Sequence, residues 1–388
     1  MEEATELPLP DAYLKFLKDS GIDPSIYTAA ESTPRYIRLK PDFEEYVQEI
    51  EAELGCDLKK VEWLPYFYSL PPHVQIASSK AYREGKIYGI DAASGAAVAA
   101  LGIVEGDHVL DLCAAPGAKL CMMLDLLGSS GSVTGVDVAS HRLAACRTML
   151  RKYALGARCR LFVADGTKFS VLPVTTRSES ESALDGDPNV FKEWTSKRSY
   201  KDRKRSRERK GVALSLASRT QDPELIFYGK DSGVIGLNNS VLYRTASNDA
   251  PLSSGYDKVL VDAECTHDGS VKHILKFENW GWKTLERRVL DAERSDDLAI
   301  LQQQLLFNGF RLLKVGGSLV YSTCSLTLSQ NEDVVKQFLL DNASAELQVI
   351  EAAKNWPCKV GNMPMTLRFD PLTSQTSGLF VAKFRKLF

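Results

Sequence analysis

Two cysteines that follow predicted strands are the residues of this chain best suited to covalent chemistry. Cys265 lies in the segment VLVDAECTHDGS, and Cys324 lies in YSTCSLTLSQNE, just past the predicted strand SLVYS. A thiolate is a strong nucleophile, so either sulfur could form a covalent intermediate. Each cysteine taken alone could equally be a small hydrophobic residue of a buried strand. Each cysteine follows a predicted strand, and we assign both strands to one sheet. The sequence therefore favours a reactive pair.

Two carboxylates lie close to Cys265 in the sequence, whereas an attacking sulfur needs surroundings that favour the thiolate. Asp262 ends the same predicted strand, and Glu264 directly precedes the cysteine. A nearby negative charge disfavours the thiolate and raises the pKa of the thiol. We therefore expect Glu264 to keep Cys265 largely neutral, which suits an assisting role better than attack.

The segment DLCAAPGAK (111–119) and two later aspartates predict a nucleoside site. In an open parallel sheet, ligands bind beyond the carboxyl ends of the strands, and small residues there let the backbone approach a ligand. Asp137 ends the second predicted strand, where a ribose diol is held, and Asp165 ends the third, where it would face an adenine edge. The alternative is a tight turn with strand-end aspartates and no ligand.

A nicotinamide cofactor is a second alternative for this site. Its fingerprint G-x-G-x-x-G is absent, and Pro116 stands where that fingerprint has small, flexible residues. A methyl donor that carries a nucleoside and no pyrophosphate fits the loop better.

Strands and helices alternate around these motifs. Between residues 99 and 170, three predicted strands alternate with two predicted helices, which is typical of a parallel sheet with helices on its faces. The pattern resumes at Tyr256 with the strand DKVLVDAEC, a helix over 296–314 that Gly316 and Gly317 would end, and the strand SLVYSTCS. The predicted fold class is therefore α/β, with a mostly parallel, doubly wound sheet.

Two regions fall outside this pattern. Residues 1–98 mix strand and helix signals and predict a smaller α+β module, which leaves 99–388 as the larger domain. Residues 172–250 far exceed the usual connection of about 2–6 residues, so we interpret them as a partly disordered insertion. Within it, the run 197–210 has nine basic and two acidic residues. This run is a solvated loop, a nuclear-localisation signal or an electrostatic RNA tether.

The composition excludes several classes of protein. Of the 388 residues, 44% are hydrophobic and 25% charged, with a formal net charge of −2, so the chain is neither collagenous nor wholly disordered. No apolar run approaches the roughly 20 residues that span a bilayer, and the N-terminus lacks a basic segment. We therefore expect no membrane partner and no secretion, and organelle targeting is not evident. The eight cysteines contain no CxxC pair, which predicts free thiols and no metal site.

Four segments together resemble the Nop2/Sun family of RNA cytosine-5 methyltransferases, which includes the bacterial Fmu-type rRNA enzymes. They are VLDLCAAPGAK, GVDVASHR, DKVLVDAEC and LLKVGGSLVYSTCSLTLSQNEDVV. IDAASGAAVAAL and SGLFVAKF fit the same pattern, and the resemblance covers residues 88–170 and 256–386 in the right order. It implies a Rossmann-like methyltransferase domain that transfers a methyl group from S-adenosyl-L-methionine to carbon 5 of a cytosine.

The resemblance also implies roles for individual residues. Cys324 would attack carbon 6 of the cytosine, and Cys265 would assist elimination and product release. Asp262 would hydrogen-bond the cytosine ring edge and stabilise the protonated adduct, and Lys119 would help to fix the target or that carboxylate. The methyl donor would be bound by Cys113, Ala114, Ala115, Pro116, Gly117, Ala118, Lys119, Asp137, Arg142, Asp165 and Asp262.

Two departures from the family pattern flank Cys265. Glu264 replaces the usual proline, whose ring would fix the backbone before the thiol, and Thr266-His267 replaces the usual Ser-Gly. His267 is either a proton acceptor near the site or a polar loop residue. The alternative to an active enzyme is a catalytically weak RNA-binding protein that keeps the methyltransferase fold.

RNA is the predicted partner. The N-terminal module resembles the family's RNA-binding extension, with Arg35 and Arg38 placed to meet phosphates. Because a duplex buries its bases, the target cytosine must be flipped out or lie in a loop. We expect tRNA rather than rRNA, a monomer, and a location in the nucleus or cytoplasm.

Overall fold

The computed structural model describes residues 9–174, 190–194, 223–245 and 254–388, which form two compact units. Unit 1 comprises Met1–Gly102, Val259–Arg311 and Val315–Phe388, and unit 2 comprises Ile103–Lys258 and Leu312–Lys314. The basic run 197–210 and most of the predicted insertion lie outside the described residues. The domain boundary predicted after residue 98 stays a prediction.

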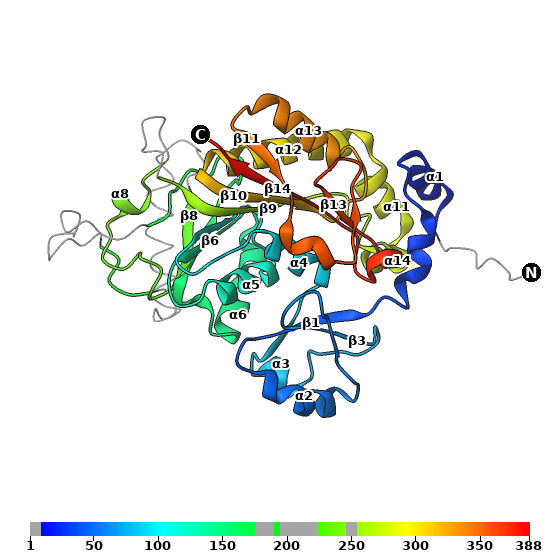
Figure 1. The fold of residues 1–388 in the computed structure, drawn as a ribbon, viewed down its shortest axis with the longest axis horizontal. Coiled ribbons are helices and arrows are strands. Elements are labelled where there is room, and N and C mark those ends of the chain that lie inside the picture. Colours follow the sequence, from blue (N-terminus) through cyan, green and yellow to red (C-terminus); the bar gives the residue numbers. More distant parts are fainter. Residues whose placement is uncertain (1–8, 175–189, 195–222, 246–253) are drawn as a thin grey trace, which may run out of the picture. The chain divides into compact units, whose positions relative to one another are not determined.

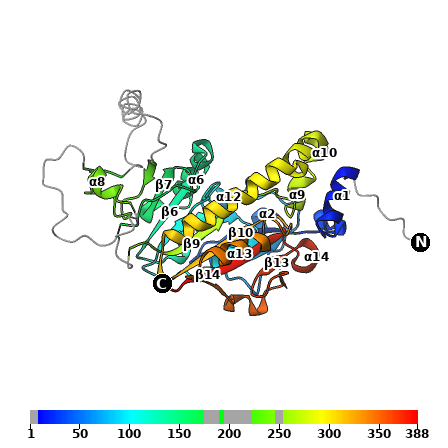
Figure 2. The ribbon, with the colours of Figure 1, turned by 90° about the horizontal axis from the view of Figure 1, so that it is seen from above.

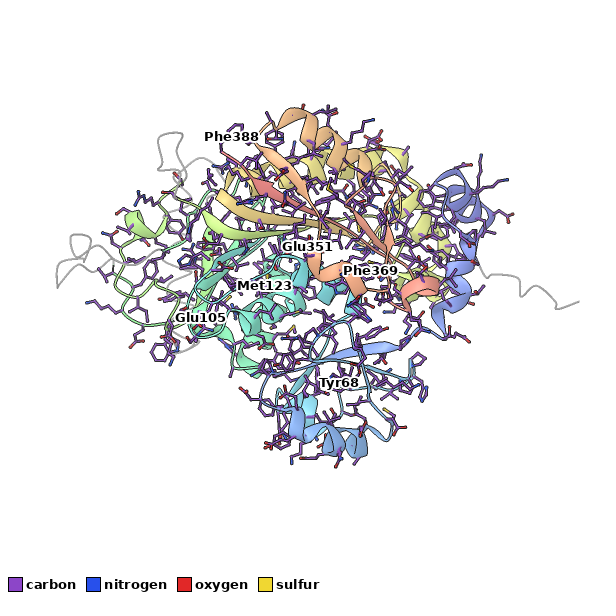
Figure 3. The ribbon with its side chains drawn as sticks, in the orientation of Figure 1. Tyr68, Glu105, Met123, Glu351, Phe369 and Phe388 are labelled. Carbon is purple, nitrogen blue, oxygen red and sulfur yellow. The ribbon has the colours of Figure 1, made fainter. Side chains whose placement is uncertain are left out.

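Unit 2 contains the three alternating strands and two helices that the sequence predicts. β5 pairs in parallel with β6, and β6 pairs in parallel with β7, while β8 pairs antiparallel with β7. The two helices connect successive parallel strands, as a parallel sheet requires. Met123, labelled in Figure 3, lies on the buried face of the first of them. The elements are β5 (His108–Asp111), α5 (Ala118–Leu126), β6 (Ser132–Asp137), α6 (Ser140–Lys152), β7 (Cys159–Val163), β8 (Glu224–Tyr228) and α8 (Asn239–Leu242).

The N-terminal part of unit 1 is a small antiparallel sheet with the strand order β2-β3-β1-β4. Short helices lie along it (Figure 1), and Ile50 of one helix joins a buried cluster with Ile37 and Leu39 of the central strand. This arrangement agrees with the predicted mixture of strand and helix signals. The elements are β1 (Arg35–Leu39), α2 (Val47–Leu54), β2 (Lys59–Lys60), β3 (Phe67–Leu70), α3 (Lys80–Arg83), β4 (Ile87–Gly89) and α4 (Ala92–Ala100).

The C-terminal part of unit 1 surrounds a long strand, β10, which neighbours β9 and pairs antiparallel with β14. β14 also pairs antiparallel with β11 and β13. Two helices, α12 and α13, lie side by side along these strands (Figures 1 and 2). The elements are β9 (Tyr256–Asp262), α12 (Ala292–Arg311), β10 (Leu313–Thr323), α13 (Glu332–Asp341), β11 (Ala345–Gln348), β12 (Lys359–Val360), β13 (Leu367–Phe369), α14 (Pro371–Ser374) and β14 (Leu379–Lys386).

A buried cluster in unit 1 joins the first helix of the chain to a group of short helices that follows Cys265. Tyr13 and Leu17 pack with Val271, Ile274 and Phe277. Elsewhere in unit 1, Phe369, the last residue of β13 (Figure 3), stacks on Trp63 with ring centroids 6.1 Å apart. The elements are α1 (Asp11–Asp19), η1 (Pro24–Ala30), α9 (Val271–Ile274), α10 (Phe277–Trp280), α11 (Trp282–Leu285) and the π-helical turn η5 (Glu286–Leu290).

The prediction for the end of the long helix was wrong. α12 ends at Arg311, and Gly316 and Gly317 lie inside β10 rather than after a helix. Leu312 and Leu313 are almost fully buried, and β10 begins at the second of them. Burial in the sheet therefore overrides the local helical pattern.

None of the helices in the described ranges combines the length and the apolar composition that a membrane span requires.

Candidate functional site

In unit 2, one buried carboxylate connects the loops that follow β5 and β6. Asp137 is 5% exposed, and its two oxygens accept hydrogen bonds from the backbone N–H groups of Ala115 (3.2 Å) and Ala139 (2.9 Å). Arg142 of α6 donates from Nη2 to the Ala115 carbonyl at 2.8 Å, and its Nη1 lies 3.9 Å from Asp137 Oδ2. The loop of the predicted donor site is thus held by two residues that the sequence assigned to the same site.

The end of this loop requires a glycine. Gly117 has a φ of +113°, and a Cβ added there would lie 3.1 Å from Cα of Cys146 on α6. Any side chain would therefore separate the start of α5 from α6. Burial raises the pKa of the Cys146 thiol to about 12, so this cysteine is a packing residue rather than a reactive one.

The second of the two predicted aspartates, Asp165, lies at the same end of the parallel strands as Asp137. Asp165 follows Ala164, whose N–H donates to the Asp137 carbonyl at 3.2 Å. Its Oδ1 accepts from the N–H and the hydroxyl of Thr167, at 2.9 and 2.7 Å. Unit 2 thus contains all of the predicted donor residues except Asp262, namely Cys113, Ala114, Ala115, Pro116, Gly117, Ala118, Lys119, Asp137, Arg142 and Asp165.

In unit 1, the two strand-end cysteines lie side by side. Sγ of Cys265 and Sγ of Cys324 are 3.3 Å apart, with Cys265 buried and Cys324 half-buried. Asp262 ends the adjoining strand, and its Oδ1 accepts a hydrogen bond from the Ser322 hydroxyl at 2.7 Å. The predicted reactive pair and the predicted carboxylate are therefore parts of one cluster.

A network of buried polar groups holds the two cysteine loops together. The Gly269 N–H donates to the Cys324 carbonyl at 2.9 Å. Thr266 donates from its N–H to Gln330 Oε1 at 3.1 Å, and Gln330 Nε2 donates back to the Thr266 hydroxyl at 3.0 Å. Asp268, which is fully buried, accepts from the Leu326 N–H at 2.7 Å.

Sequence reasoning did not single out this network. Its members lie about sixty residues apart in the chain, so their pairing is not visible from local spacing. The only local signal is the polar end of the STCSLTLSQNE segment, which contains Gln330. Tyr27 also belongs to the network, because its hydroxyl donates to the Asp268 carbonyl at 2.6 Å.

The pKa of Cys265 is raised as predicted, but the main cause differs. Burial raises the pKa of the Cys265 thiol well above its ordinary value, and the neighbouring Cys324 adds to this effect. The carboxylate of Glu264 is exposed and forms an ion pair with Arg294, with Oε1 3.2 Å from Nη2. The thiol is therefore kept neutral mainly by the apolar interior rather than by the preceding glutamate.

Of the two arginines predicted to meet phosphates, Arg38 is misplaced for that role. Its side chain is 1% exposed, donates to the Pro65 carbonyl at 3.2 Å and lies over the Phe67 ring. A strand residue alternates between faces, and Arg38 points into the module. Arg35 is half-buried and donates to the Val74 carbonyl at 2.9 Å.

Arg35 lines a cavity of about 370 Å³ within unit 1. Tyr36, Asp91 and Lys272 also line it. Lys272 donates to the Thr33 carbonyl at 2.6 Å, and burial, followed by the charge of Arg35, lowers its pKa. Two cations beside an aromatic ring are suited to a phosphate and a base of RNA.

A family model described as 16S rRNA methyltransferase RsmB/F matches residues 98–177 and 234–385, well over half of the chain. The chain belongs to this family. The recognition of a Nop2/Sun methyltransferase from four sequence segments is confirmed.

Curated relatives of the RsmB/F family match large parts of the chain. The rRNA (cytosine-C(5))-methyltransferase NOP2C of Arabidopsis thaliana is 23% identical over 346 residues, which cover 78% of this chain and 53% of that protein. The 5-cytosine rRNA methyltransferase NSUN4 of Bos taurus is 30% identical over 265 residues, which cover 68% of this chain and 48% of that protein. The chain thus spans about half the length of these curated relatives.

A solved structure supports the fold. The crystal structure of NSun6 from Pyrococcus horikoshii with SFG superposes with a TM-score of 0.65 at 16% identity, covering 98% of this chain and 99% of that one. The predicted α/β fold class, a Rossmann-like methyltransferase domain with a smaller N-terminal α+β part, is confirmed.

Proposed function

We propose that this chain transfers a methyl group from S-adenosyl-L-methionine to carbon 5 of a cytosine in RNA. The observation that carries the proposal is the pair of sulfurs, 3.3 Å apart, at adjoining strand ends of an RsmB/F family member. One sulfur is half-buried and the other is buried with a raised pKa, so the two thiols differ in the way that two distinct roles require.

The chemistry of cytosine explains why a thiolate is needed. Carbon 5 of the intact ring is a poor nucleophile, and covalent addition splits one hard step into easier ones. The Cys324 sulfur forms a bond to carbon 6, and the electron pair displaced from the ring moves to carbon 5, which accepts the methyl group. The proton on carbon 5 is then lost, the bond from sulfur to carbon 6 breaks, and the thiolate is released.

The remaining residues of the thiol cluster have supporting roles in this proposal. Asp262 hydrogen-bonds the edge of the cytosine and stabilises the protonated adduct, while Ser322 orients its carboxylate. Cys265 assists the elimination, and Lys119 helps to fix the target cytosine.

The residues of unit 2 fit a nucleoside-bearing donor. Ala114, Ala115 and Gly117 place little side chain on the loop, and a Cβ at Gly117 would lie only 3.1 Å from Cα of Cys146 on α6. Asp137 offers a buried carboxylate for the ribose diol, and Asp165 lies beside it for the adenine edge. The family resemblance and the crystallisation of NSun6 with SFG, an analogue of S-adenosyl-L-methionine, support the same donor.

Replacing Asp137 by alanine is expected to weaken binding of S-adenosyl-L-methionine by roughly 10- to 100-fold, because hydrogen bonds to a charged group contribute about 1.5–3 kcal/mol. Isothermal titration calorimetry measures the affinity. Asp231→Asn is the matched control, since Asp231 is an acidic residue of the same unit with a side chain 54% exposed. Equal affinities for Asp137→Ala and the control would contradict the assignment.

The cavity beside Arg35 is proposed to bind RNA. Arg35→Ala should weaken RNA binding about 3- to 10-fold and reduce the slope of log affinity against log salt by about one, because one phosphate contact is lost. Fluorescence anisotropy with a labelled tRNA over a salt series measures both quantities. Lys59→Ala, at an exposed lysine of the same sheet, is the control. An unchanged slope for Arg35→Ala would exclude the phosphate contact.

The class of RNA that is methylated can be identified by sequencing all cellular RNA. We expect tRNA, while the names of the two curated relatives favour rRNA as the alternative. Bisulfite sequencing of RNA from cells with and without the protein identifies cytosines that lose methylation. Loss in tRNA supports the expectation, and loss in rRNA supports the alternative. Unchanged methylation in every RNA class, with RNA binding retained, would leave a catalytically weak RNA-binding protein.

A further inference from the structure

His267 occupies a backbone position that glycine normally fills. Its φ is +60°, in the left-handed region that most side chains avoid. The family usually has glycine at this position, so the loop keeps its shape while it gains an imidazole. The cost of this conformation is about 1–2 kcal/mol for a residue with a Cβ.

The imidazole contacts the proposed nucleophile directly. Nδ1 of His267 lies 2.8 Å from Sγ of Cys324 and 3.7 Å from Sγ of Cys265. Cys324 is therefore the closer of two sulfur partners of this nitrogen, and its hydrogen bond is the stronger one. The residue as a whole is exposed, so its other nitrogen can exchange protons with water.

The surroundings of His267 favour its protonated form. The neighbouring Cys265 is the largest cause that raises the pKa of His267, burial opposes the increase, and Glu264 and Asp262 add to it. On the other side, the ring packs edge to face against His273, with centroids 5.7 Å apart. Burial lowers the pKa of His273, and the charges of His267, then of Lys276 and Arg288, lower it further.

We propose that His267 is the base that activates Cys324, an inference that rests on the proposed function. The proton on Cys324 Sγ passes to Nδ1 of a neutral His267, which leaves a thiolate beside an imidazolium. The sulfur electron pair then forms the bond to carbon 6 of the cytosine. Cys265, farther from Nδ1 and buried, stays protonated. The arrangement is that of a cysteine activated by an adjacent histidine.

Two variants test this role without a risk of strain. His267→Gly restores the residue that the left-handed backbone favours, and His267→Asn keeps a polar side chain that tolerates the same conformation. Both remove the base. The readout is the rate at which iodoacetamide alkylates Cys324 in the free protein with EDTA present, quantified by mass spectrometry between pH 6 and pH 10. His73→Gly, at an exposed histidine of the same unit, is the control.

At neutral pH we expect both variants to be alkylated roughly ten times more slowly than the control, since a few per cent of an unassisted thiol is ionised there. The difference should close at the alkaline end of the series, where the thiol ionises without a base. A merely structural effect would persist across the range. Equal rates at neutral pH, or an equal loss at every pH, would overturn the proposal.

The alkylation experiment needs neither RNA nor a methyl donor. It therefore distinguishes failure of the proposed function from failure of the proposed role of His267. Cys324 alkylation that depends on His267, without methylation of any RNA, would overturn the proposed function. Methylation by the wild type with unchanged alkylation of the variants would instead overturn the role of His267. In an active enzyme, the same variants should lower kcat about tenfold or more at neutral pH with a smaller effect on KM.

Discussion

Cys324→Ala should abolish methylation of cytosine in RNA, with a loss in kcat of roughly 10³-fold or more. Without the sulfur, no bond to carbon 6 forms and carbon 5 stays a poor nucleophile, so the variant loses the covalent route as a whole. The assay is transfer of a labelled methyl group to cellular RNA, followed by nuclease digestion to identify 5-methylcytosine.

The variant should fold and bind the methyl donor normally. Cys324 is half-buried, and its backbone carbonyl, which anchors Gly269, is retained in alanine. Cys358→Ala is the matched control, because Cys358 is another half-buried thiol of unit 1, and burial raises its pKa to about 11. A Cys324→Ala enzyme as active as the control would refute the assignment of the nucleophile.

Cys265→Ala should cause the covalent intermediate between the protein and RNA to accumulate, whereas Cys324→Ala prevents its formation. Cys265 is a neutral thiol 3.3 Å from the attacking sulfur, placed to assist when that sulfur leaves carbon 6. Loss of an assisting acid or base group costs typically 10²- to 10⁴-fold, so release of the methylated RNA should become rate-limiting. A denaturing gel detects the adduct as a protein band that migrates more slowly and carries labelled RNA.

Two comparisons make this result specific. The double variant Cys265→Ala, Cys324→Ala should form no adduct, because the nucleophile is absent. Cys265→Ser should restore part of the release of methylated RNA, since a hydroxyl can replace the thiol as a proton donor. An adduct that accumulates to the same level in the wild type would exclude the assisting role of Cys265. Because Cys265 is 1% exposed, circular dichroism is needed to show that each variant is folded.

The motifs of both sites could be predicted from the sequence because they are local. The loop after β5 consists of consecutive residues, and a strand that ends in an acidic residue or a cysteine is visible in the hydrophobic pattern. The parallel order of β5, β6 and β7 follows from the alternation of strands with helices. Asp137 could therefore be assigned to the same site as a loop more than twenty residues away.

Other features depended on contacts between distant segments. Glu264 is adjacent to Cys265 in the chain, yet its carboxylate pairs with Arg294 because the start of α12 lies beside it. Arg38 is buried against Phe67 of the neighbouring strand, and that pairing is not visible in a basic pattern such as PRYIRLK. Gly316 and Gly317 lie inside β10, because burial of Leu312 and Leu313 overrides the local helical pattern.

His267 illustrates the difference between what the sequence alone determines and what only the tertiary structure decides. The sequence alone determined the family, the donor loop, and the two strand-end cysteines, because each is encoded in a contiguous stretch whose type and order suffice. Only the tertiary structure decided that burial, rather than Glu264, keeps Cys265 neutral, and that Nδ1 of His267 lies 2.8 Å from Cys324. The physical reason is that solvation and hydrogen-bond partners depend on where segments about sixty residues apart meet, which no local pattern records.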